Sequence, residues 1–190
     1  MICFGGAYNL NWFWYFTIYS FLGFLLEAAF ALLLRERPDR KCFLVLPLCP
    51  VYGLGACACL LLAPLAKGGV QYILCAAVCT VIEYAMAGWY ERCAGVRFWD
   101  YTGIFGNLRG RVCLPFSAAW GLLALILVNW IHPMITGAVS SIPACVTFVA
   151  VPVLLADGAA SHLLLRRTRD CACLRWYDAV FTGKERFNRG

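Results

Sequence analysis

Charged residues are scarce in this sequence. Asp, Glu, Lys and Arg together make up 14% of the 190 residues, whereas a soluble domain carries roughly 25%. Apolar residues reach 63%, and the mean hydropathy is +0.75. So few charges cannot cover a surface that faces water, and no polar stretch is long enough to fold separately. We therefore predict one compact domain embedded in a lipid bilayer.

The motifs of several enzyme and binding classes are also missing. The twelve cysteines include no CxxC pair and no zinc-ligand spacing. The Cys171-x-Cys173 pair supplies only two ligands, too few for a typical metal site. The glycines and lysine of an ATPase phosphate loop are absent. We predict no metal and no cofactor, and any ATPase that drives this protein must be a separate chain.

The net charge of +6 does not indicate nucleic-acid binding. The basic residues stand in short clusters that flank apolar runs, as topology determinants do, and not in one continuous patch. A cleavable signal peptide is not expected either. The N-terminus has no basic region, and the first apolar run, residues 12–34, is too long for a signal-peptide core.

Apolar runs of the length needed to cross a bilayer recur along the chain. They predict an all-α, polytopic bundle of about five transmembrane helices, near residues 12–34, 43–66, 70–90, 115–131 and 142–165. Residues 1–170 would form the membrane domain and residues 171–190 a basic tail. Pro152 is expected to kink the last span.

The distribution of basic residues predicts the orientation. Fifteen of the sixteen lysines and arginines fall in the 35–41 loop, in the loop after the third span and in the tail, which leaves Lys67 on the other side. The positive-inside rule places the basic face in the cytosol. We therefore predict a multi-pass protein of the cell (inner or plasma) membrane, with its N-terminus outside and its C-terminus inside.

Three predicted spans each carry one carboxylate eight or nine residues before the cytosolic charges: Glu27, Glu83 and Asp157. At about 1.5 Å per residue, all three lie roughly 12–14 Å from those charges along their helices. Charged groups in hydrocarbon usually face a bundle interior or a cavity and mark functional sites. We take these three residues and Tyr84 as candidates for substrate binding or proton coupling. The alternative is that each acid only fixes helix packing.

The loop after the third span, residues 96–112, mixes aromatic and basic residues with glycines, which is typical of the membrane interface. Its candidate residues for a gate, a partner-docking surface or an anion site are Trp99, Asp100, Tyr101, Asn107, Arg109 and Arg111. Arginines bind phosphate and carboxylate groups bidentately. Simple anchoring of a cytosolic interfacial loop is the alternative.

Several ordered motifs resemble those of the ABC-transporter permease family called CmpB-type, or type IV. The stretch RKCFLVLPLCPVYGLG (40–55) is similar to that family's entrance motif, and EYAMAGWYE (83–91) to its second signature. In the entrance motif the matching residues are Arg40, Pro50, Tyr52 and Gly53. The resemblance covers most of residues 12–131. It implies a small, multispanning bacterial membrane protein with a role in transport.

These observations favour a transporter (permease) subunit for a small solute, with Glu27 and Glu83 lining a cytosol-facing cavity. Its expected partners are the lipid bilayer, further copies of itself and a separate ATPase subunit. One alternative is an intramembrane enzyme that acts on lipid headgroups, with Arg109 and Arg111 holding a phosphate. No serine–histidine or metal-ligand arrangement supports it. The other alternative is a non-catalytic adaptor that uses the basic tail against anionic lipid.

Overall fold

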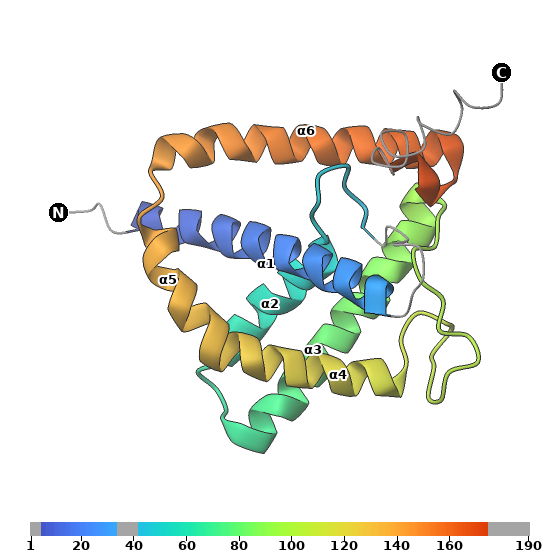
Figure 1. Cartoon of the computed structure of the whole chain (residues 1–190), viewed down its shortest axis with the longest axis horizontal. Coiled ribbons are helices and arrows are strands. Elements are labelled where there is room, and N and C mark those ends of the chain that lie inside the picture. The colour runs from blue at the N-terminus through green and yellow to red at the C-terminus, as the bar shows by residue number, and fades with distance from the viewer. Residues whose placement is uncertain (1–4, 34–41, 175–190) are drawn as a thin grey trace.

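The protein is described by a computed structural model, in which residues 5–33 and 42–174 are placed (Figure 1). Helices account for most of this part of the chain, and no residue in it belongs to a β-strand ladder, as the sequence predicts. The main helices are α1 (Gly5–Leu33), α2 (Pro50–Leu62), α3 (Gly68–Trp89), α4 (Leu114–Ile126), α5 (His132–Ser140) and α6 (Ala144–Thr168). Short π-helical turns, η1 (Tyr90–Ala94) and η2 (Leu127–Ile131), extend α3 and join α4 to α5.

Within residues 5–33 and 42–174, four helical stretches are long and apolar enough to cross a membrane: Leu10–Leu33, Gly68–Ala94, Leu114–Ser140 and Ala144–Thr168. The fifth apolar helix, α2, has 13 residues and is therefore only about 20 Å long. It is shorter than the predicted 43–66 span because residues 43–49 form a bent loop that ends at Pro50, the first residue of the helix. The fourth span continues through η2 and α5, beyond its predicted end at 131. The last span runs through Pro152 as one helix.

Helices α1 and α2 cross at very short range because glycines stand at the crossing. A methyl group on Gly23 would overlap the ring of Tyr52, and one on Gly53 would overlap the Ser20 hydroxyl and the Phe16 backbone. Small residues allow this kind of close approach in lipid, where apolar side chains gain little by leaving the surrounding hydrocarbon. The crossing fixes the position of Tyr52 against α1.

Helices α3 and α4 form a second tightly packed pair, and α2 lies against α3. At Gly121 a methyl group would overlap Tyr72 and Ala76 of α3. The Tyr72 hydroxyl donates a hydrogen bond to the Ala118 carbonyl of α4, at 3.0 Å. The order of packing is therefore α1–α2–α3–α4, and α5 returns to contact α1 (Figure 1).

Helix α6 is held to the other helices mainly through the 42–49 loop. Asp157 accepts hydrogen bonds from the Leu46 N–H at 3.2 and 3.3 Å, and the Ser161 hydroxyl accepts one from the Val45 N–H at 3.0 Å. A disulfide between Cys42 and Cys49 closes the same loop. These contacts satisfy backbone donors that a bent loop leaves without helical partners.

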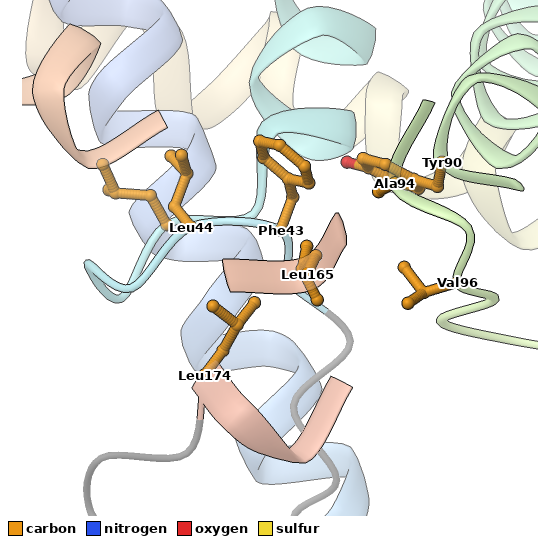
Figure 2. Packing of buried hydrophobic residues seen from close by; sticks show 8 residues of the cluster. Phe43, Leu44, Tyr90, Ala94, Val96, Leu165 and Leu174 are labelled. Atoms are coloured by element: carbon orange, nitrogen blue, oxygen red, sulfur yellow. The ribbon is translucent and has the colours of Figure 1, made fainter. Parts of the chain in front are cut away.

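A buried apolar cluster lies where the 42–49 loop meets η1 and the end of α6 (Figure 2). The Phe43 ring stacks on Tyr90 with ring centroids 5.4 Å apart, and Leu165 of α6 is fully buried beside them. Leu174, in the short 3-10 turn η3 (Cys171–Leu174), also belongs to this cluster. The cluster therefore attaches the last helix to η1 and to the start of the 96–112 loop.

Candidate functional site

The first carboxylate of the site, Glu27, is positioned by the crossing of α1 and α2. It stands four residues after Gly23, so both residues lie on the same face of α1. The Tyr52 ring occupies the space left by Gly23, and its hydroxyl donates a hydrogen bond to Glu27 Oε1 at 2.6 Å. Glu27 is therefore oriented by a phenol from the next helix.

The second carboxylate, Glu83, is buried in α3 with 2% of its surface exposed. The Tyr101 hydroxyl donates to its Oε1 at 2.9 Å, and the Trp120 indole N–H donates to its Oε2 at 2.9 Å. Hydrogen bonds from two neutral donors offset part of the cost of burying a carboxylate. Because each oxygen has its own donor, the orientation of this carboxylate is fixed.

Aromatic rings connect the two carboxylates. The Tyr52 and Trp120 rings meet edge to face, with centroids 4.8 Å apart and an interplanar angle of 66°. Tyr52 donates to Glu27 and Trp120 donates to Glu83, so this ring pair joins the two acids in one constellation. The Tyr101 ring stacks on Phe116 of α4, again with centroids 4.8 Å apart.

A cavity of about 190 Å³ opens among these groups. Both carboxylates line it, as do Leu26 and Phe30 of α1. Its aromatic lining consists, besides Phe30, of Tyr52, Trp99, Tyr101, Phe116 and Trp120. Chain segments far apart in the sequence thus enclose a small space that has two acids and mainly aromatic walls.

The loop that carries Tyr101 is folded by its own hydrogen bonds. The Trp99 indole N–H donates to the Arg111 carbonyl at 2.8 Å, and the Tyr101 N–H donates to the Gly110 carbonyl at 2.8 Å. Gly110 has φ +70°, and a methyl group there would overlap the Asp100 carboxylate, so only glycine fits. Burial, and then the nearby Glu83 carboxylate, raise the pKa of Tyr101, which keeps its hydroxyl protonated as a donor.

Three charged residues of this loop, Asp100, Arg111 and Arg97, are engaged within it or with η1. The Thr102 hydroxyl and then its N–H donate to Asp100, and together they lower the pKa of that carboxyl. Arg111 forms an ion pair with Glu91 through two nitrogens, and this hydrogen bonding raises the pKa of Arg111. Arg97 bridges Glu91 and Asp100, at 3.0 Å from each. These contacts hold the loop against the end of α3.

The predicted candidates therefore fall into separate groups. Glu27 and Glu83 share the cavity, but Asp157 does not line it and contacts the 42–49 loop instead. The Arg111 guanidinium lies over the Tyr84 ring, with Arg111 Cζ 5.0 Å from the ring centroid. The Asn107 side chain bonds to backbone groups within the loop.

The remaining candidates lie at other positions. Arg109 has φ +56° in the same turn as Gly110. Pro50 begins α2, Gly53 stands at the α1–α2 crossing, and Arg40 lies outside the described residues.

Sequence reasoning did not select Trp120 or Phe116 as site residues. Trp120 lies near the start of an apolar helix, where tryptophan is ordinarily an interface anchor. Its bond to Glu83 joins residues 37 positions apart, which no local pattern reveals. One signal in the sequence could have pointed to Trp120, because the pair Trp120-Gly121 also agrees with the pattern of the family that the sequence resembles.

A family model with the description "Putative ABC-transporter type IV" matches residues 14–161 of the chain. That range includes both carboxylates, their hydrogen-bond donors and the loop between α3 and α4. The search of curated proteins found no match, and the search of solved structures found none.

Proposed function

We propose that this chain, which belongs to the family described as "Putative ABC-transporter type IV", is a transport subunit that binds an organic cation between Glu27 and Glu83. The observation that carries the proposal is the pair of carboxylates in one aromatic-walled cavity. The cation would carry an ammonium group. Its movement would be driven by a separate ATPase chain.

The charge of the cavity favours a cationic solute. Its lining includes two carboxylates, and among the described residues that line it there is no lysine, arginine or histidine. Within a bilayer, a carboxylate is stable when it is protonated or when a cation lies beside it. A cation bound between Glu27 and Glu83 would therefore stabilise both carboxylates.

The aromatic walls favour an ammonium group over a metal ion. Rings attract an organic cation through their negative faces when it lies within about 6 Å of the ring centroid. The cavity has six aromatic side chains but only two carboxylates, whereas hard metal ions prefer six or more oxygen ligands. Several aromatic rings around a small space are typical of sites that recognise quaternary ammonium ions.

The interactions of Arg111 favour transport over chemistry on a lipid phosphate. This arginine would have to hold a phosphate in the enzyme hypothesis, yet it is bound to Glu91 and lies over the Tyr84 ring. Its ion pair supports the fold of the loop that presents Tyr101. The same loop, on the side predicted to be cytosolic, is the surface we propose for contact with an ATPase subunit.

Native mass spectrometry of the protein, extracted gently from its host membrane, tests this proposal. We expect a complex in which each copy of this chain is accompanied by at least one ATPase subunit. When tetramethylammonium is added, the complex should gain the mass of that ion. A homo-oligomer or monomer that lacks an ATPase and does not gain this mass would contradict it. A retained lipid product in that case would favour the enzyme alternative.

A further inference from the structure

A second cavity, of about 210 Å³, adjoins the acidic one. The two share five lining residues, which form the boundary between them: Leu26, Val51, Tyr52, Trp120 and Leu123. Beyond this boundary the second cavity follows α1, α2 and the α4–η2 segment away from the carboxylates. We refer to it as the apolar slot.

The lining of the apolar slot offers almost nothing to a polar group. Leu22, Ala56, Leu127 and Ile131 are typical of its walls. The polar side chain at its far end, Tyr19, is hydrogen-bonded to His132 Nδ1 at 2.9 Å. Because that hydroxyl already has a partner, the slot is suited to hydrocarbon along its whole length.

The slot is open at its side to the surrounding lipid. Leu22 and Leu26 of α1 are 37% and 40% exposed, and Leu123 and Ile126 of α4 are 36% and 39% exposed. Helix α1 packs on α2, whereas α4 packs on α3, so the slot lies between α1 and α4. A molecule dissolved in the bilayer can therefore enter without crossing the protein.

The length of the slot corresponds to one leaflet. It extends along α4 and η2 from Trp120 to Ile131, which is about 16 Å at 1.5 Å per residue. That is about half of the ~30 Å hydrocarbon core of a bilayer. A single hydrocarbon chain whose head lies in the acidic cavity would therefore fill the slot along its length.

We propose that the two cavities form one site for a single-chain amphipathic cation, with the ammonium head between Glu27 and Glu83 and the hydrocarbon chain in the apolar slot. The inference rests on the proposed function and specifies its substrate class. Charge complementarity defines the head, and the continuity of the acidic cavity with the slot defines the chain. The substrate would come from the bilayer and not from the aqueous phase.

The test compares two probes on the whole chain in lipid nanodiscs, with binding to empty nanodiscs subtracted. Tetramethylammonium has the head alone, and dodecyltrimethylammonium has the head and a chain. Leu127→Trp and Leu22→Trp narrow the slot from opposite walls, and neither residue lines the acidic cavity. Leu122→Trp is the matched control, since it stands on α4 but lines neither cavity and is 57% exposed.

We expect each slot variant to weaken dodecyltrimethylammonium binding at least ten-fold and tetramethylammonium binding less than two-fold, with both unchanged in Leu122→Trp. Two slot variants are used because one of them could misfold, which gel filtration would detect. The other variant would then still test the slot. Suppose that Glu83→Gln weakens tetramethylammonium binding, but that each folded slot variant changes the affinities for both probes equally. The hydrocarbon site in the slot is then wrong, and the proposed function stands. If tetramethylammonium binding is insensitive to Glu83→Gln, both are wrong. Uncharged dodecanol that binds as tightly as dodecyltrimethylammonium would also overturn the amphipathic-cation site.

Discussion

Replacing Glu83 by glutamine removes one charge from the cavity and keeps its hydrogen bonds. The Trp120 indole can only donate, so it orients the amide oxygen of the new side chain toward itself. The amide NH₂ then faces Tyr101, whose hydroxyl can accept as well as donate. Because every partner stays satisfied, Glu83→Gln should fold and insert normally.

The expected loss of affinity follows from the distance at which an ammonium ion contacts a carboxylate. At about 4–5 Å and an effective dielectric constant of about 20, one such charge contributes roughly 3–4 kcal/mol. Its removal should weaken tetramethylammonium binding roughly 100- to 1,000-fold. Glu27→Gln removes the other charge and should cause a loss of the same order, because both acids line the same cavity.

Flow dialysis of labelled tetramethylammonium against the protein in nanodiscs measures this change. Asp157→Asn is the matched control. It also neutralises an acid in a membrane helix, but Asp157 does not line the cavity. We expect this control to bind within two-fold of the wild type. Equal affinities in Glu83→Gln and in the wild type would show that Glu83 does not hold the cation. A loss in Asp157→Asn as large as that in Glu83→Gln would show that the effect is not specific to the cavity.

Three further predictions concern the loop and the topology. Tyr101→Phe removes one hydrogen bond to Glu83 but keeps the ring, so it should lower the free energy of unfolding by about 1.5–3 kcal/mol; an unchanged melting temperature would contradict this. The hydrogen bonds from Thr102 lower the pKa of the Asp100 carboxyl below its ordinary 3.8. These bonds therefore stabilise the loop above pH 3.8, and they are lost as the pH falls through the lowered pKa. Hydrogen exchange in residues 99–112, corrected for intrinsic rates, should therefore be constant from pH 7 to pH 5 and accelerate only near the lowered pKa, whereas acceleration already at pH 5 would argue against this role. Cys42 and Cys49 form a disulfide in the structure, yet they follow in sequence the basic segment predicted to face the reducing cytosol; in cells both should therefore be reduced, and both should be alkylated once acid-quenched protein is unfolded, whereas a pair that stays protected would reverse the predicted topology.

The sequence could select three acids by their spacing, but it could not give their partners. Equal spacing from the cytosolic charges selected Glu27 and Glu83, which do line one cavity. The same spacing selected Asp157, which instead accepts N–H bonds from the 42–49 loop. Depth along a helix gives one coordinate only. The direction of each side chain around its helix depends on packing that a single sequence does not reveal.

The helices themselves were more predictable than their ends. Apolar runs define the four long spans because the bilayer sets their length. The short α2 was harder, since Pro47 and Pro50 interrupt an apolar run that hydropathy reads as continuous. The residues of the 42–49 loop are buried or half-buried against other parts of the protein, which is where non-helical backbone is tolerated in a membrane.

Transport in host membrane vesicles tests whether this chain moves an organic cation by means of its paired carboxylates. Such vesicles retain any ATPase partner, and both orientations can be prepared. We predict ATP-dependent accumulation of labelled tetramethylammonium in one orientation by vesicles with the wild-type chain, and none by vesicles with Glu83→Gln at equal expression. Equal accumulation by the two, or none by the wild type in either orientation, would contradict the account.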